Sequence, residues 1–147
     1  MRVLVVEDER DLNRLLQKVQ ALNEGGLETK QLVEAIKSYI SENIYYDLSR
    51  ETIAEQLKYH PDHLSRVFKK ATGETLINYI QNEKIKTAIY LFKETNLSVS
   101  QVADRLGYTN FSYFSQLFKQ KTGYTVREYK RKYLNKTDGD NATDLLR

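Results

Sequence analysis

An internal repeat constrains the fold of this chain more than any other feature of its sequence. The segment Leu64–Thr75 recurs as Phe114–Thr125, at an offset of 50 positions. Seven residues are identical at this offset: Ser65, Phe68, Lys69, Thr72, Gly73, Thr75 and Tyr79. Upstream, three further pairs match at an offset of 49: Ile53 with Val102, Ala54 with Ala103, and Leu57 with Leu106. A turn between two helices can absorb the change of one position, so the sequence predicts two copies of one structural unit.

The first copy has the pattern of a helix, a tight turn and a second helix. Its first helix begins near Ser49 or Thr52, both of which suit an N-cap. Pro61 suits the first position of the second helix, where its missing N–H group costs nothing, and Gly73 suits a left-handed C-cap. Apolar residues at helical spacing predict the buried faces of the two helices: Ile53, Ala54 and Leu57, then Leu64, Val67 and Phe68.

The second copy repeats this pattern. Ser98 is the expected N-cap of its first helix, Gly107 permits the turn, and Gly123 ends the second helix. The segment Thr125–Glu128 has the spacing of a capping box and predicts one more helix. The predicted buried faces are formed by Val102, Ala103 and Leu106, then by Phe111, Phe114, Leu117 and Phe118.

The second helix of each copy carries polar and basic side chains opposite its apolar face. A helix fits the major groove of DNA, where polar side chains match base edges and flanking Lys and Arg pair with phosphates. A helix that merely faces solvent more often shows Glu–Lys pairs, whereas residues 110–122 contain no acid. We therefore expect helices 61–71 and 110–121, the reading helices, to bind double-stranded DNA. The expected DNA-facing residues are Asp62, His63, Ser65, Arg66, Lys69 and Lys70 in the first reading helix, and Asn110, Ser112, Tyr113, Ser115, Gln116 and Lys119 in the second.

The expected fold is all-α, with about seven helices in residues 29–134 and with Thr29 as the first N-cap. Two tandem helix-turn-helix units, at about 49–72 and 98–122, are joined by a long linker helix at about 76–93. Eighteen residues of helix span roughly 27 Å, and neighbouring major grooves on one face of DNA lie roughly 34 Å apart. The linker could hold the two reading helices one turn apart, be simply the central core helix, or do both.

Charge and composition agree with a DNA-binding role. Residues 58–136 carry 15 Lys or Arg and 6 Asp or Glu, a net charge of +9, whereas residues 1–57 carry a net charge of −4. This basic stretch is typical of a protein that binds a polyanion. The absence of cysteine excludes disulfides and thiolate metal sites, and no apolar run is long enough to span a bilayer, so we expect a cytoplasmic protein without cofactors. Residues 135–147 form a polar tail.

Residues about 33–134 resemble the DNA-binding domain of the AraC/XylS family of bacterial transcription regulators. The resemblance rests on several short motifs: Ile53-Ala54, the segment 64–70, Thr72-Gly73, Leu106-Gly107-Tyr108, Tyr113-Phe114-Ser115, Phe118-Lys119 and the segment 122–125. It implies a seven-helix domain that places two reading helices in successive major grooves and regulates transcription through contact with RNA polymerase.

Four positions depart from the pattern of this family. His60 replaces a small capping residue, Lys84 and Gln116 stand where Arg is common, and Val126 stands where Pro is common. Gln116 matters most for DNA recognition, because Gln favours adenine where Arg favours guanine. The sequence therefore predicts an adenine preference at the base that Gln116 reads.

Residues 1–26 resemble a different domain. The segment Arg2–Glu9 is similar to the first strand and acidic turn of a response-regulator receiver domain, in which Asp8 would help to bind magnesium. Only a first strand and helix are present and no phosphoacceptor Asp follows, so we expect neither phosphorylation nor magnesium binding. The apolar side chains of the predicted helix, Leu12, Leu15, Leu16, Val19 and Leu22, suggest either packing on the domain or a homodimer formed through residues 1–24.

Two other classes of function compete with DNA binding. Asp62 with His60 and His63 is too small a set for an enzyme site, since the chain has no cysteine and no glycine-rich phosphate loop. No catalytic or metal-binding residues are therefore expected. A helical protein–protein interaction module that has lost DNA binding would carry acids on the reading helices, and these helices have almost none.

Overall fold

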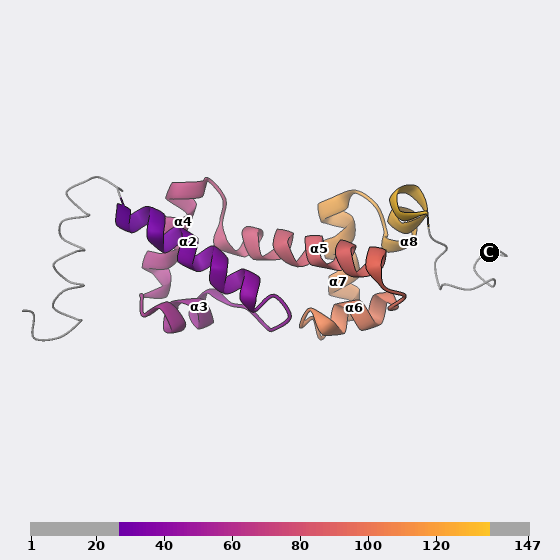
Figure 1. The fold of residues 1–147 in the computed structure, drawn as a ribbon, viewed down its shortest axis with the longest axis horizontal. Coiled ribbons are helices and arrows are strands. Elements are labelled where there is room, and N and C mark those ends of the chain that lie inside the picture. Colours follow the sequence, from indigo (N-terminus) through magenta and orange to yellow (C-terminus); the bar gives the residue numbers. More distant parts are fainter. Residues whose placement is uncertain (1–26, 136–147) are drawn as a thin grey trace, which may run out of the picture. The chain divides into compact units, whose positions relative to one another are not determined.

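The computed structural model of this protein describes residues 27–135, and every regular element in them is helical (Figure 1). This confirms the prediction of an all-α fold with about seven helices. In the described part these helices are α2 (Leu27–Glu42), α3 (Arg50–Leu57), α4 (Pro61–Thr72), α5 (Leu76–Glu94), α6 (Val99–Arg105), α7 (Phe111–Thr122) and α8 (Val126–Tyr129), followed by a π-helical turn, η1 (Lys130–Leu134). The receiver-like stub at 1–26 and nearly all of the tail lie outside the described residues.

The described residues divide into two compact units. Unit 1 comprises residues 27–39 and 50–76, and unit 2 comprises residues 40–49 and 77–135. The first helix-turn-helix, α3 and α4, lies in unit 1, and the second, α6 and α7, lies in unit 2. The predicted linker helix is observed as α5, one residue longer at its C-terminal end than expected.

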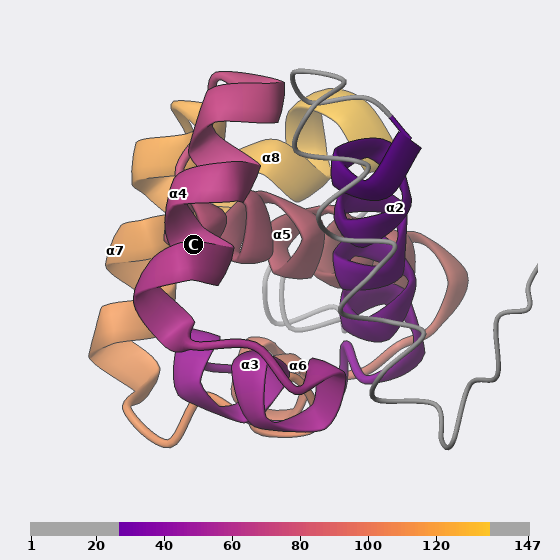
Figure 2. The ribbon, with the colours of Figure 1, turned by 90° about the vertical axis from the view of Figure 1, so that its left-hand side faces the viewer.

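Unit 1 is built from the first part of α2 together with α3 and α4 (Figure 2). Pro61 opens α4 and Gly73, at φ 83°, closes it in the left-handed conformation, as the sequence predicts. The buried apolar side chains of the unit are Leu32, Val33, Ile36, Ile53, Ala54, Leu64, Phe68 and Leu76. Leu57 and Val67, predicted to be buried, are only half-buried.

The core of unit 2 forms where α6, α7 and α8 pack around α5 (Figure 1). Phe92 and Phe118 meet edge to face at 5.9 Å, a favourable arrangement for aromatic rings. The core cluster comprises Ile85, Ala88, Leu91, Phe92, Val102, Ala103, Leu106, Phe114, Leu117, Phe118 and Val126. The second reading helix is therefore held by an aromatic core on its inner face.

Local caps fix where the helices of unit 2 begin and end. Ser98 and Gln101 form a capping box at the start of α6, and Thr125 and Glu128 form the predicted one at the start of α8. Gly123 ends α7 at φ 86°. These caps satisfy backbone groups that would otherwise lack partners at the helix ends.

Lys84 of α5 joins three segments of unit 2 from a buried position. Its side chain is 4% exposed, and Nζ donates hydrogen bonds to the carbonyl oxygens of Ile44 at 3.0 Å, Tyr46 at 2.5 Å and Leu106 at 2.5 Å. An ammonium group has three N–H donors, so all of them are used. Burial lowers the pKa of Lys84 to about 8, against the opposing effect of the Asp47 carboxylate. The lysine thereby fixes the residue before the Gly107 turn.

Two sequence predictions about single residues were wrong. Thr29 is not an N-cap, because α2 begins at Leu27 and continues through it. Phe111 does not belong to the inner face of α7, since its side chain is 48% exposed whereas that of Phe114 is fully buried. Phe111 is the first residue of the helix, where the chain enters from a turn, and the helical spacing of apolar residues does not determine the direction of a side chain at that position.

Among the described residues, no helix is both long enough and apolar enough to cross a membrane.

Candidate nucleic-acid interface

The outward face of α4 carries the six residues predicted for the first reading helix. Asp62, His63, Arg66, Lys69 and Lys70 are exposed, and Ser65 is half-buried. Arg66, Lys69 and Lys70 form no ion pair with any residue between 27 and 135. Three cations are thus available to an external anion along one helix.

Two side chains at the start of α4 form polar interactions within the protein. His60 is the N-cap, and its Nδ1 accepts a hydrogen bond from the backbone N–H of Asp62 at 3.1 Å. The Asp62 carboxylate in turn forms an ion pair with Arg50 of α3 at 2.9 Å. This ion pair therefore connects α3 and α4, the two helices of the first helix-turn-helix. It also partly neutralises an acidic side chain that was expected to lie beside DNA.

His63 is held by an aromatic neighbour from the turn. Its ring stacks on that of Tyr59, with centroids 5.7 Å apart and planes at 21°. The stacking limits the rotation of an imidazole that is exposed on α4. His63 can therefore present a hydrogen-bonding edge in a defined direction.

The outward face of α7 carries the second predicted set. Asn110, Ser112, Tyr113, Gln116 and Lys119 are exposed, and Ser115 is half-buried, as is its repeat counterpart Ser65. The face has no acidic side chain. All twelve predicted site residues thus lie at accessible positions, six on α4, five on α7 and one, Asn110, at the N-cap of α7.

Two members of the second set take part in positioning α7. Asn110 is its N-cap, and Oδ1 accepts a hydrogen bond from the backbone N–H of Tyr113 at 2.9 Å. The Tyr113 hydroxyl oxygen accepts a hydrogen bond from Gln81 Nε2 of α5 at 3.0 Å. Because an Asn needs both its amide oxygen and its NH₂ group for a bidentate contact with adenine, the cap weakens Asn110 as a base-reading residue. Gln116 carries no such constraint.

Sequence reasoning missed three features of this interface. Phe111 adds an exposed apolar ring to the start of α7, and Arg50 and Gln81 hold members of the predicted site from neighbouring helices. The exposure of Phe111 had one weak signal, its place directly after the N-cap Asn110. The two partners had none, because they lie 12 and 32 residues from the side chains they contact.

Residues 27–135 contain no group of three or more His, Cys, Asp or Glu side chains placed to hold a metal ion.

Comparison with known families decides what kind of domain this is. Residues 53–132, which run from within α3 through α8 into η1, match the family described as a helix-turn-helix domain. The chain belongs to this family, in its AraC-type form. For an AraC-type domain the functions are DNA binding and transcription regulation.

Curated relatives of the AraC-type chain are transcription regulators. The bifunctional transcriptional activator/DNA repair enzyme AdaA of Bacillus subtilis is 35% identical over 99 residues, which is 67% of this chain and 47% of that protein. The transcriptional regulatory protein YesN of the same organism is 36% identical over 80 residues, 53% of this chain and 22% of YesN. The chain thus spans less than half the length of each of these relatives.

Solved structures show the same fold for the AraC-type domain. The C-terminal domain of AraT, a response regulator from Geobacillus stearothermophilus, matches this chain with a TM-score of 0.66 at 30% identity. The match covers 76% of this chain and 95% of the AraT domain. The DNA-binding domain of AdpA, solved with a target DNA, has a TM-score of 0.64 and covers 69% and 91%. At 20% identity the likeness to AdpA shows the fold alone.

Proposed function

We propose that this protein binds double-stranded DNA sequence-specifically by placing α4 and α7 in two successive major grooves. One observation carries the proposal: each helix has a well-packed inner face and an outer face whose side chains suit DNA and have no ion-pair partner among residues 27–135. On α4 these are Arg66, Lys69 and Lys70, and on the acid-free face of α7 they include Gln116 and Lys119. Polar groups that suit base edges thus lie beside cations that suit phosphates.

We assign different roles to the predicted site residues, and the contacts of the described residues support this division. Arg66 and Gln116 are exposed and have no polar partner among residues 27–135, so we expect them to read bases. Lys69, Lys70 and Lys119 pair with phosphates. Phe111 offers an apolar ring of the kind that contacts the methyl group of thymine. Asp62, Asn110 and Tyr113 chiefly hold the reading helices in place, because their polar atoms have partners within the protein.

Selection of binding sites from random duplex DNA tests this proposal. The whole chain should enrich a motif with two conserved tracts, and its affinity for a scrambled version of that motif should be at least tenfold weaker. The Gln116→Arg variant should then change an adenine to a guanine at one position of the motif and leave the other tract unchanged. Equal affinity for the selected and scrambled duplexes would falsify sequence-specific binding.

The proposal also includes two partners besides DNA: RNA polymerase and a second copy of this chain. The family relationship favours a non-enzymatic protein of the bacterial cytoplasm that contacts RNA polymerase at its promoters. A homodimer through residues 1–24 rests on the apolar pattern of the sequence alone, since that segment lies outside the described residues. Sedimentation of the whole chain beside a chain that starts at residue 27 tests the dimer, and the dimer is excluded if both chains sediment as monomers.

A further inference from the structure

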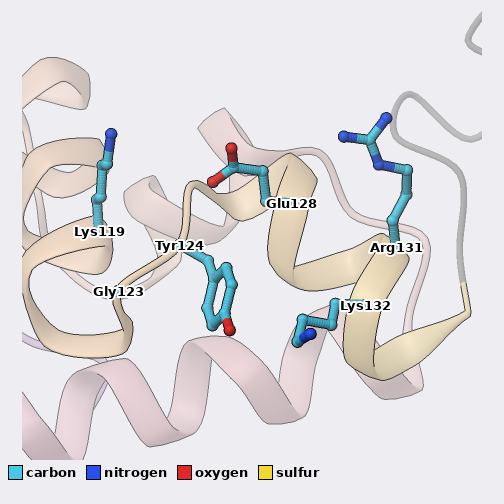
Figure 3. A pocket seen from close by; sticks show the side chains of 6 residues that line it. All are labelled: Lys119, Gly123, Tyr124, Glu128, Arg131 and Lys132. Atoms are coloured by element: carbon cyan, nitrogen blue, oxygen red, sulfur yellow. The ribbon is translucent and has the colours of Figure 1, made fainter.

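A basic hollow lies beside the C-terminal end of the second reading helix. It has a volume of about 570 Å³ and is lined by Lys119, Gly123, Tyr124, Glu128, Arg131 and Lys132 (Figure 3). These residues come from three consecutive parts of unit 2: the last turns of α7, the short connection after it, and the helical segment formed by α8 and η1. In Figure 3 the side chains of Lys119, Glu128 and Arg131 project to the same side of the hollow.

The charges of the hollow are unbalanced. Three cationic side chains and one carboxylate line it, and that carboxylate already serves as a cap, because Glu128 Oε1 accepts a hydrogen bond from the Thr125 N–H at 2.9 Å. This hydrogen bond, with smaller effects from Lys119 and Arg131, lowers the pKa of Glu128, so the carboxylate is charged at neutral pH. Neither Lys119 nor Arg131 forms an ion pair with any described residue. Lys132 lies 5.8 Å from the ring centres of Tyr124 and Tyr133.

The internal repeat shows that this charge is peculiar to the second copy. At the offset of 50, Lys119 corresponds to Lys69, but Arg131 and Lys132 correspond to the neutral Gln81 and Asn82. The two added cations are therefore not part of what the repeated fold requires. They supplement a reading helix whose central base-reading residue, Gln116, is neutral where the first copy has Arg66.

We propose that the hollow binds a backbone phosphate of the DNA just outside the groove that α7 occupies, with Arg131 and Lys119 as its ligands and Lys132 adding to the local field. The inference rests on the proposed function and adds to it Arg131 and Lys132, two residues of η1 that lie outside both reading helices. A guanidinium offers a phosphate two parallel hydrogen bonds, and a lysine adds a point charge. Such a contact fixes the position of α7 along the DNA without reading any base.

The salt dependence of DNA binding reports how many phosphates the protein neutralises and provides the test. The whole chain and the double variant Arg131→Gln/Lys132→Gln are compared on one duplex of about 30 base pairs, three helical turns, that carries the selected motif. The slope of log affinity against log salt should fall by about 0.9 for each phosphate that is no longer neutralised, so by up to about 0.9 in the variant, which loses one phosphate contact. The base preference of the variant should be unchanged.

A charge-matched control separates a local contact from net charge. The variant Lys86→Gln/Lys93→Gln removes two exposed lysines from α5 and should leave the slope unchanged. An unchanged slope in the hollow variant, or an equal fall in both variants, overturns the phosphate contact while leaving the proposed function intact. If the unmodified chain fails to bind the duplex at all, the proposed function fails, and the phosphate contact fails with it. Circular dichroism of both variants shows whether they are folded.

A second arm distinguishes DNA phosphate from a free anion. Inorganic phosphate is titrated into the whole chain without DNA while the thermal midpoint is followed, with chloride at equal ionic strength as the reference. Equal midpoints in the two salts support the DNA backbone as the source of the phosphate. A saturable rise with phosphate that is absent from the Arg131→Gln/Lys132→Gln variant would instead assign the hollow to a free anion and overturn the proposal.

Discussion

At the scale of the residue, Lys84 links buried charge to the position of a DNA-reading helix. Its ammonium group binds carbonyl oxygens from the segment after α2 and from Leu106, next to the turn that leads into α7. A neutral side chain at this position would leave three carbonyl oxygens without these hydrogen bonds, at a cost of about 1–3 kcal/mol for each one left unsatisfied. The residue therefore contributes to the geometry of the second unit rather than to DNA contacts.

The lowered pKa of Lys84 gives stability a specific pH dependence. Below pH 8 the lysine is protonated in the folded and unfolded states, so its contribution is constant. Between about 8 and 10.5 only the unfolded chain holds the proton, and the free energy of unfolding should rise with pH. The Lys84→Arg variant keeps its charge throughout and is the reference. In urea titrations at several pH values, the original chain should gain stability relative to this variant above pH 8. A difference that stays constant with pH contradicts the assignment.

Two phenylalanines of α7 should respond oppositely to truncation. Phe114 is fully buried, so Phe114→Ala should lower the free energy of unfolding by about 3–5 kcal/mol. Phe111 is 48% exposed, so Phe111→Ala should change it by less than about 1 kcal/mol and reduce DNA affinity instead. Urea unfolding and titration with the selected duplex measure the two effects. If Phe111→Ala lowered stability as much as Phe114→Ala, the result would show that Phe111 is part of the core.

At the scale of the element, the two helix-turn-helix units form equivalent turns with different residues. Gly107 has φ 85°, and at the repeat offset of 49 its counterpart is Lys58, which adopts φ 65°. A side chain in the left-handed region costs about 1–2 kcal/mol. The two turns also differ in space, because a Cβ atom at Gly107 would lie 3.2 Å from the backbone of Tyr46.

Reciprocal substitutions at these two turns should have opposite signs. Lys58→Gly should leave stability unchanged or raise it by up to about 1 kcal/mol, since it removes strain from an exposed position. Gly107→Ala should lower it by about 2 kcal/mol or more, because backbone strain adds to the contact with Tyr46. Thermal or urea unfolding of the two variants measures both changes. A Gly107→Ala chain as stable as the original would show that the turn is not constrained in this way.

Elements defined by local signals were predicted well from the sequence. Proline at the first position of α4, the glycine C-caps of α4 and α7 and the capping box of α8 act over one turn of chain, and the observed helices begin and end where these signals stand. The contacts that individual polar residues make within the protein were not predicted. Asp62 and Asn110 suit a DNA-facing surface by type, but the former pairs with Arg50 and the latter caps its own helix. The pairing of Asp62 with Arg50 becomes visible only in the packed structure, because the two residues lie on different helices.

At the scale of the whole molecule, α5 connects the two helix-turn-helix units in sequence. Its 19 residues amount to roughly 28 Å of helix, a length of the same order as the roughly 34 Å between neighbouring major grooves. The length of α5 is therefore compatible with the proposal that the two reading helices bind successive major grooves.

A substitution in one reading helix should weaken recognition of one tract of the DNA motif and leave recognition of the other tract unchanged. Arg66→Ala should relax one position of the first tract and cost about 1–3 kcal/mol of binding free energy, and Gln116→Ala should do the same in the second tract. Titrations with duplexes mutated in one tract at a time measure the two effects. If both substitutions relaxed the same base pair, the two helices would not be reading separate grooves.

Protection of major-groove base edges on the selected duplex is the most direct test of DNA recognition by two helices. With the whole chain bound, we predict two protected tracts whose centres lie about one helical turn, roughly 10 base pairs, apart on one face of the DNA. Arg66→Ala should weaken protection in one tract and Gln116→Ala in the other. A single protected tract, or protection by both units of the same tract, would contradict the proposal that α4 and α7 occupy successive major grooves.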